Sequence, residues 1–367
     1  MTGKELWYIS QAHHAGQLAG DGNYTKKCHQ WLENHTHCHK AFLTHSCTAA
    51  LEMSAILADL KPGDEVIMPS YTFVSTANAF VLSGAVPVFV DIRPDTLNLD
   101  ETLVEIAITP RTRAIVAVHY AGVGCEMDTL QHIAAKHQLL LIEDAAQGLM
   151  ASYKGKPLGS FGDLGCFSFH ETKNIISGEG GALIINNSQF TESAEIIREK
   201  GTNRSQFFRG QVDKYTWIEK GSSYLPGELI AAFLYAQFEE AQQIIANRLK
   251  VWGYYHQLLD PLEKAGKLRR PIIPPDCQHN AHMYYVLLED LQTRTQLISY
   301  LKEQSINAVF HYVPLHSSPA GKYYGRVNGM MKNTELLSDC LLRLPMFPEL
   351  TTSQIEIIVE SIKSFFN

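Results

Sequence analysis

The chain has 367 residues, of which 45% are hydrophobic and 19% charged, and its net charge is -7. This length allows two lobes with sizeable cores, and the negative charge without a long Lys/Arg run argues against a nucleic-acid-binding surface. The sequence contains no apolar run long enough to span a membrane and no signal-peptide segment, and its seven cysteines form no C-x-x-C pair. We therefore expect a cytoplasmic protein with reduced thiols and no membrane or nucleic-acid partner.

One short segment, HTHCHK at residues 35–40, combines three histidines with a cysteine. These are residue types that bind zinc. The segment lies beside a predicted helix end, and a second ligand cluster is not evident in the sequence. We interpret it as a solvated loop and predict no metal site.

Seven β-rich apolar runs between residues 41 and 186 are predicted to be strands. The early runs alternate with helix-period stretches such as residues 48–60 and 127–138. Short strands buried on both faces and joined by helices favour a largely parallel sheet in an α/β lobe. The predicted strands span residues 41–46, 64–70, 86–92, 113–122, 139–146, 166–170 and 182–186.

A polar segment at residues 201–225 follows the sheet region and is too long for an ordinary connection. Such loops are often functional or contact a partner. The helical stretch 227–259 is predicted to bridge to a second lobe. After it, the pattern predicts strands at 282–288 and 307–313 separated by a helix at 293–304. We expect a large α/β domain at residues 1–240 and a small α+β domain at 241–367.

Polar and aromatic residues follow the first two predicted strands, where an open α/β sheet binds its ligands. Ser46 and Thr48 precede a helix whose first N–H groups are suited to a phosphate, although a simple N-cap is an equally good reading. Tyr71 and Phe73 are placed to cover a planar ligand, with burial in the core as the alternative.

A second group of polar residues follows the fifth and sixth strands. Adjacent strand residues point to opposite faces, so only one of Glu143 and Asp144 can face a site. A carboxylate there needs a cationic or hydrogen-bonding partner. Gln147 is expected to reach the same pocket, and Ser168 and Lys173 follow at the end of the sixth strand.

Pyridoxal 5′-phosphate is one ligand that accounts for these groups together. Its phosphate requires N–H and hydroxyl donors, which Thr48, Ala49 and Ser168 are expected to supply. Its ring requires a stacking partner, for which Phe73 is the candidate.

The reactive end of the same ligand requires two further groups. Its ring nitrogen needs a carboxylate, for which Asp144 is suited, and its aldehyde needs an amine, for which Lys173 is suited. The glycines at 178, 180 and 181 would allow the positive φ that turns this lysine back into the pocket.

Three motifs carry a resemblance to a known family: MPSYTFVSTANA at residues 68–79, EDAAQ at 143–147, and SFHETKN followed by GEGG within residues 168–181. In this order they resemble the DegT/DnrJ/EryC1 sugar aminotransferases, and the match extends through nearly the whole chain. The resemblance implies a fold-type-I pyridoxal-phosphate enzyme with a seven-stranded, mostly parallel sheet. It also implies Lys173 and Asp144 as catalytic residues, and a homodimer with active sites at the interface.

Further stretches at residues 18–33, 118–129, 195–217 and 310–316 give a finer resemblance. They are similar to family members that transfer an amino group from glutamate to C4 of a dTDP-linked 4-keto-6-deoxy sugar. Tyr312 and His316 are then candidate sugar contacts, unless they only pack the two lobes together.

Three other readings remain open. The chain could aminate the same sugar to the gluco product or act at C3. It could be a sugar dehydratase, in which a histidine replaces the lysine; His170 lies close by, but Lys173 is present. It could also be a regulatory homologue without activity.

Two stretches depart from the family pattern. The chain begins later than members of the family usually do, without an early strand near an Ile-Pro-Phe motif. The pattern G-x-N-x-R-M, whose Asn reaches the partner subunit's cofactor phosphate in relatives, is replaced by GSSYLP at residues 221–226. Either Ser223 or a backbone group takes over that contact, or the contact is missing.

Overall fold

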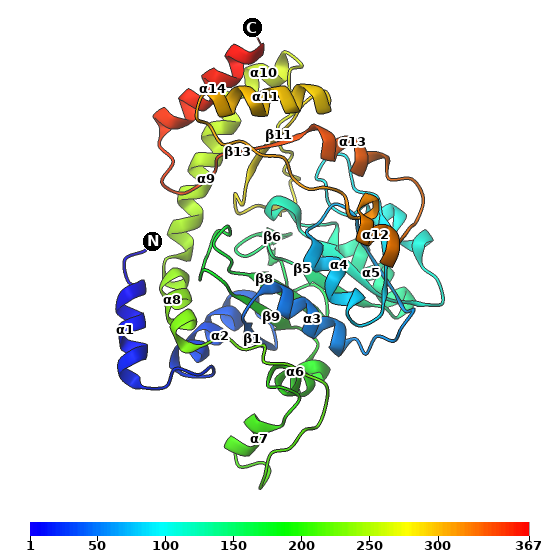
Figure 1. Cartoon of the computed structure of the whole chain (residues 1–367), viewed down its shortest axis with the longest axis vertical. Coiled ribbons are helices and arrows are strands. Elements are labelled where there is room, and N and C mark those ends of the chain that lie inside the picture. The colour runs from blue at the N-terminus through cyan, green and yellow to red at the C-terminus, as the bar shows by residue number, and fades with distance from the viewer. Residues whose placement is uncertain (367) are drawn as a thin grey trace.

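The computed structural model describes residues 1–366 and is built around an eight-stranded sheet (Figure 1). The strand order is β1-β9-β8-β5-β4-β2-β3-β12. The strands are β1 (Lys40–Thr44), β2 (Glu65–Pro69), β3 (Val86–Val90), β4 (Thr112–Val118), β5 (Leu140–Asp144), β8 (Leu164–Ser168), β9 (Gly181–Ile185) and β12 (Arg326–Val327).

The sheet is parallel except for β9, which runs antiparallel to both β1 and β8. The seven strands predicted from the sequence are all present, and the mostly parallel α/β fold is confirmed. The eighth strand, β12, comes from the C-terminal part of the chain and was not predicted, because two residues give too short a pattern to recognise.

Helices cover both faces of this sheet because alternate strand residues bury apolar side chains on opposite sides. One face packs on α3 (Cys47–Leu57), α4 (Val74–Val81) and α6 (Thr191–Arg198). The other face packs on α5 (Met127–His137) over its centre, and at the β1 end on α1 (Glu5–Ala15), α2 (Asn23–Thr36) and α8 (Glu228–Glu239). The carboxyl ends of the parallel strands are left open to form a site.

The C-terminal lobe has its own apolar core, formed by residues between 251 and 362. Its small sheet pairs β11 (Tyr284–Leu287) with β13 (Leu341–Leu344) in antiparallel fashion. The other elements after residue 227 are α9 (Ala241–Leu258), α10 (Asp260–Lys264), α11 (Leu291–Glu303), α12 (Pro319–Tyr324), α13 (Lys332–Cys340) and α14 (Thr352–Phe366). A three-stranded ribbon joins β6 (Ser152–Tyr153), β7 (Lys156–Pro157) and β10 (Cys277–Gln278).

The stretch 227–259 is helical as predicted and consists of two consecutive helices, α8 and α9, which meet at Glu240. One strand prediction for this region was wrong. The stretch 307–313 is not a strand: only Val309 makes an isolated bridge, to Arg343, and its neighbour Phe310 is exposed. The strand that pairs with β11 is β13, which lies later in the sequence.

The C-terminal part of the chain returns to the large sheet through β12, which pairs with β3. Arg326 makes hydrogen bonds of 2.9 and 2.7 Å to the two carboxylate oxygens of buried Glu65, and Arg111 binds the same carboxylate. The domain boundary at residue 240 stays a prediction, and the chain beyond it contributes to both lobes.

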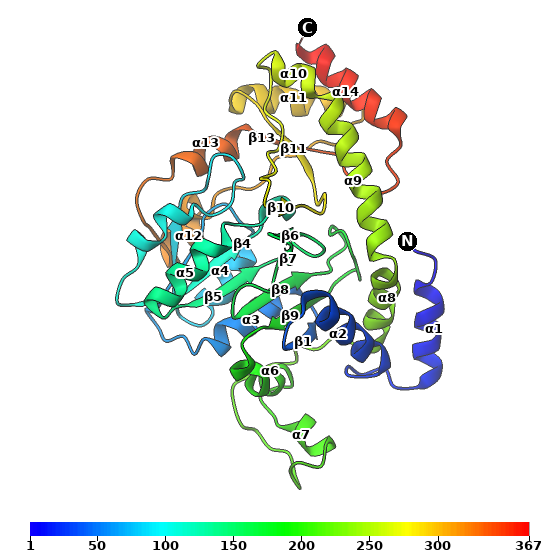
Figure 2. The ribbon, with the colours of Figure 1, turned by 180° about the vertical axis from the view of Figure 1, so that it is seen from behind.

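The polar segment 201–225 contains one short helix, α7 (Arg204–Phe208), and extends away from the sheet at the end opposite α14 (Figure 2). It presents large side chains to solvent, including Phe208 and Trp217. Within residues 1–366, no helix has the length and apolar character needed to cross a membrane.

Candidate active site

A cavity of about 440 Å³ opens at the carboxyl ends of the sheet strands, between the two lobes. Its size is typical of small-molecule and cofactor sites. Most of the predicted site residues come together in its lining, although they are distant in sequence. The predicted residues that line it are Thr48, Phe73, Asp144, Gln147, Ser168, Lys173 and Tyr312.

Lys173 reaches this cavity from the turn that follows β8. Its backbone N–H donates to the carbonyl of His170 at 2.9 Å, and Glu171 donates to the carbonyl of Gly178 at 2.8 Å. Gly178 has φ 84°, which favours glycine and closes the turn. Burial is the main reason that the pKa of the Lys173 amine is lowered from its usual 10.5; nearby Cys47 and Asp144 oppose this effect.

Asp144 ends β5 and faces the same cavity, with 6% of its surface exposed. One carboxylate oxygen accepts a hydrogen bond from the Thr76 hydroxyl at 2.7 Å, and the other accepts from the Ala146 N–H at 3.1 Å. These two donors fix the orientation of the carboxylate and leave it lone pairs for a ligand.

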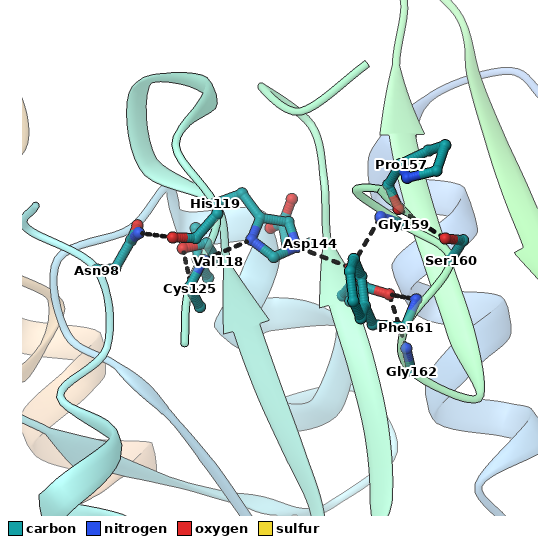
Figure 3. Close-up of polar contacts among 12 residues, drawn as sticks. Asn98, Val118, His119, Cys125, Asp144, Pro157, Gly159, Ser160, Phe161 and Gly162 are labelled. Carbon is teal, nitrogen blue, oxygen red and sulfur yellow. Dashed lines mark hydrogen bonds and ion pairs between the residues drawn. The ribbon is translucent and has the colours of Figure 1, made fainter. Parts of the chain in front are cut away.

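Glu143 points to the opposite side of the sheet, as the alternation of strand side chains predicts. Its carboxylate accepts the Gly159, Phe161 and Gly162 N–H groups at 2.6–2.7 Å. It also lies 2.9 Å from Nε2 of buried His119. Figure 3 shows His119 and this loop beside the end of β5. Glu143 therefore holds the loop in place, while its neighbour Asp144 serves the cavity.

The N-terminus of α3 forms another wall of the cavity. Ser46 caps this helix by accepting the Ala49 N–H at 3.0 Å, and the hydroxyls of Thr48 and Ser75 lie 2.8 Å apart. This turn therefore both caps α3 and lines the cavity. The Ala49 N–H, predicted to bind the phosphate, instead donates its hydrogen bond to Ser46. A Cβ at Gly181 would collide with the Ser46 and Cys47 backbone, so glycine there allows β9 to approach the helix.

Aromatic side chains form the outer rim. Phe73 is 57% exposed, and its ring centroid lies 6.2 Å from that of Tyr312. The Tyr312 hydroxyl accepts a hydrogen bond from Gln147 Nε2 at 3.0 Å, and Gln147 Oε1 accepts from the Ala121 N–H at 2.7 Å. Gln147 thus links the sheet to the segment that carries Tyr312.

Four of the residues named from the sequence do not line this cavity: Ala49, Tyr71, His316 and Ser223. His316 lies 2.7 Å from the Ser70 hydroxyl and 3.3 Å from Glu335, an arrangement that suits packing between the lobes. Ser223 is exposed and forms a bridge with Glu199. Their proposed contacts to sugar and to the partner's cofactor stay predictions. Among residues 1–366, no group of three His, Cys, Asp or Glu side chains is arranged to hold a metal ion.

The sequence did not indicate several polar residues of the cavity lining, among them Thr76, His282, His311 and Arg343. Thr76 follows Phe73 by three residues in the motif MPSYTFVSTANA, and residues three apart in a helix lie on the same face. This spacing could have indicated that Thr76 faces the cavity. Burial lowers the pKa of both histidines, that of His311 to about 2, so both are neutral near pH 7. Arg343 comes from the unpredicted strand β13 and gave no sequence signal.

The groups in the cavity fit pyridoxal 5′-phosphate. An amine with a lowered pKa, a positioned carboxylate and a helix N-terminus next to hydroxyl groups line one space. They match the aldehyde, ring nitrogen and phosphate of the cofactor. When bound, this cofactor supplies an electron sink for amino-group transfer. The sequence prediction assigns the cofactor's ring nitrogen to Asp144 and its aldehyde to Lys173, and the structure places both residues in the lining of this cavity.

Comparison with known proteins identifies the family. The model of the DegT/DnrJ/EryC1/StrS aminotransferase family matches residues 1–363. The chain is 36% identical to the uncharacterized protein MJ1066 of Methanocaldococcus jannaschii, covering 93% of this chain and 90% of that protein. It is 31% identical to the spore coat polysaccharide biosynthesis protein SpsC of Bacillus subtilis, covering 88% and 84%.

A solved structure leads to the same conclusion. The aminotransferase TlmJ from Streptoalloteichus hindustanus superimposes with a TM-score of 0.90 at 26% identity, over 99% of this chain and 95% of that one. The fold, the cavity and these matches show that the chain belongs to the DegT/DnrJ/EryC1/StrS family of pyridoxal-phosphate-dependent, fold-type-I aminotransferases.

Proposed function

We propose that this protein transfers the amino group of L-glutamate to C4 of dTDP-4-keto-6-deoxy-D-glucose. The products are dTDP-4-amino-4,6-dideoxy-D-galactose and 2-oxoglutarate, and the amino sugar would enter a surface polysaccharide of the lipopolysaccharide or enterobacterial common antigen type. The observation that carries an amino-transfer function is the pairing of Lys173 and Asp144 in one cavity. The choice of sugar rests on the finer sequence resemblance, most of all in residues 195–217.

The roles of the two residues follow from their positions. The Lys173 amine, with its lowered pKa, takes the proton from the donor's α-carbon and returns protons during the second half of the reaction. Asp144, fixed by Thr76, stabilises the protonated ring nitrogen. Polysaccharide synthesis as the destination agrees with the spore coat polysaccharide biosynthesis for which the Bacillus subtilis relative SpsC is named.

The decisive experiment is incubation of the purified protein with dTDP-4-keto-6-deoxyglucose and glutamate, followed by NMR of the product. An axial amino group at C4 supports the galacto product. An equatorial group at C4 or an amino group at C3 identifies a sister aminotransferase, and loss of oxygen without amination identifies a dehydratase. Absence of any reaction together with absence of bound cofactor would favour a regulatory protein.

Lys173→Ala tests the chemistry separately from the sugar. The wild-type protein is expected to be yellow and to keep its cofactor covalently after borohydride treatment. The variant should retain no covalent cofactor and show no turnover, because no other amine lines the cavity among residues 1–366. An active Lys173→Ala protein would disprove the assigned role.

A further inference from the structure

The residues just before β11, among them Asn280 and His282, connect the small lobe to the site. Arg248 of α9 holds their backbone by donating to the Ala281 carbonyl at 3.0 Å and to the His282 carbonyl at 2.7 Å. Asn280 Nδ2 donates to two carbonyls of the loop that follows β5, each at 2.8 Å. The backbone that carries His282 is therefore fixed from both lobes.

The hydrogen bonds around the His282 ring decide which of its nitrogens carries the hydrogen. Asn174 Nδ2 donates to the Asn280 carbonyl at 2.8 Å, so Asn174 Oδ1 is the atom that lies 3.1 Å from His282 Nδ1. An amide oxygen only accepts, and Nδ1 therefore carries the hydrogen. Burial lowers the pKa of His282 and keeps the ring neutral near pH 7, so Nε2 is an unprotonated acceptor.

This acceptor has no donor within the described chain. His282 is 6% exposed, and none of the hydrogen bonds among residues 1–366 includes its Nε2. Buried His29 shows the usual arrangement, in which Nε2 accepts the Leu43 N–H at 2.9 Å. Because buried polar atoms are nearly always paired, we expect a donor to meet His282 Nε2 during the reaction.

Lys173 is the donor that the lining of the site offers. His282 and Lys173 line the active-site cavity together and also share a second, smaller pocket. They are close enough for the charge of Lys173 to lower the pKa of His282. Two other donor side chains line both spaces: Gln147, whose Nε2 already donates to Tyr312, and Ser168, which is expected to bind the phosphate.

We propose that His282 is a positioning residue for Lys173 and accepts a hydrogen bond from the lysine amine whenever that amine is free. This inference rests on the proton transfer by Lys173 proposed above. When the amine takes the donor's α-proton, the electron pair of the broken C–H bond passes to the electron sink of the cofactor, and the lysine becomes an ammonium ion. Neutral His282 accepts a hydrogen bond from this ammonium without taking the proton. The contact stabilises the charged lysine and keeps the proton beside the atoms to which it returns.

The first test is the titration of Lys173 in the amino-loaded protein, which is prepared with pyridoxamine 5′-phosphate and leaves the lysine amine free. Acetic anhydride labels only a neutral amine, and mass spectrometry of the Lys173 peptide over a series of pH values gives the midpoint of labelling. His282→Leu should move this midpoint to lower pH, equivalent to a roughly tenfold weaker hold on the proton. His282→Gln, whose amide oxygen accepts in place of Nε2, should recover part of the shift. A merely loosened site would do the reverse, because water that reaches the lysine raises its pKa toward the usual 10.5.

The second test is the half-reaction with L-glutamate and no sugar, followed by the change in cofactor absorbance. We expect His282→Leu to lower the rate at saturating glutamate by roughly 10–100-fold, the effect of a lost hydrogen bond to a charged group. His282→Gln should recover part of this rate as well. A defect that only weakens donor binding would instead raise KM and leave the saturating rate unchanged.

His256→Leu is the matched control. His256 of α9 contacts the Tyr284 hydroxyl through Nδ1 and does not line the cavity, so its replacement should change neither the Lys173 titration nor the half-reaction. A labelling midpoint that rises or stays constant in His282→Leu, a change in KM alone, or a loss confined to the reaction with the nucleotide sugar would each overturn the proposal. The titration uses neither glutamate nor sugar, so a wrong donor or sugar in the proposed function would not affect its result.

Discussion

The candidate catalytic residue Asp144 is held in one orientation by a hydroxyl group. Its carboxylate accepts from Thr76, and Thr76 in turn lies 2.8 Å from the Thr72 hydroxyl. The sequence indicated that a carboxylate should face the site here, but it could not identify the donor. The contact joins residues 68 positions apart, which only the folded chain brings together.

Thr76→Val should lower kcat about tenfold, because it removes one hydrogen bond to a charged group and frees the carboxylate to rotate. KM values for donor and sugar should change little, since neither substrate touches Thr76 in the proposed reaction. Thr102→Val is the matched control: its hydroxyl also donates to an aspartate, Asp100, but on the exposed surface. Equal activity of Thr76→Val and wild type would contradict this role.

The pH dependence of folding has an identifiable source in Glu65. Hydrogen bonding by Arg326 is the first cause that lowers the pKa of this carboxyl from 4.5 to about 2. A lowered carboxyl pKa stabilises the fold above about pH 4.5, and that stabilisation is lost as the pH falls toward 2.

Arg326→Gln should therefore reduce the free energy of unfolding at pH 7 by about 1–3 kcal/mol. Arg111 still binds Glu65, which limits the loss. The difference from wild type should shrink as the pH approaches 2, and urea unfolding at several pH values measures it. Lys363→Gln, which removes an exposed pair with Glu360, should cost less than about 1 kcal/mol at any pH. A pH-independent difference for Arg326→Gln would exclude Glu65 as its source.

Strand and helix patterns predicted the large lobe well and the small lobe poorly. The large-sheet strands are buried and mostly apolar runs between turns, so their pattern is clear. In the small lobe, the apolar stretch 307–313 suggested a strand, but Val309, Phe310 and Val313 remain exposed. The true strand β13 contains Arg343 and directly follows a helix, which obscured it. Strand β11 pairs with β13, which lies more than 50 residues later, and local sequence patterns do not show which distant strands pair.

Gly181→Ala tests the close contact between β9 and α3. The added methyl group would meet the Ser46 and Cys47 backbone, so the helix must shift. We expect a loss of about 1–3 kcal/mol in unfolding free energy and weaker cofactor binding. Gly253→Ala in α9 has free space around it and should stabilise the protein by up to about 1 kcal/mol. Thermal unfolding should show that Gly181→Ala lowers and Gly253→Ala raises the stability of the protein, and cofactor titration should show the weaker binding. Wild-type stability of Gly181→Ala would contradict a close contact between β9 and α3.

At the scale of the whole molecule, we propose that two copies associate through the segment 201–225. Trp217 is 79% and Phe208 68% exposed there, and the rim residue Phe73 is also uncovered. Exposed aromatic side chains in one segment are typical of a protein contact. The family resemblance implies a dimer with active sites at the interface, which would cover these groups.

Light scattering should then give twice the chain mass of 41.1 kDa. Trp217→Glu should weaken the dimer and lower activity together, because a buried charge opposes association. Ile357→Glu also replaces an exposed apolar side chain by a carboxylate, but it lies on α14 at the other end of the molecule and should leave the dimer intact (Figure 1). A fully active monomer of the wild-type chain would contradict the proposal.

The return of the chain through β12 limits how the two lobes can move. The C-terminal lobe is connected to the large sheet through the helices α8 and α9. A second connection is made by β12, where Arg326 donates hydrogen bonds to Glu65 and Val327 pairs with Phe89. A body fastened at two separated points cannot swing about a single hinge without breaking one attachment. The entrance of the cavity should therefore keep a nearly constant width during turnover, and adjustments to substrates of different size fall to side chains such as Phe73 and Tyr312 rather than to closure of the lobes.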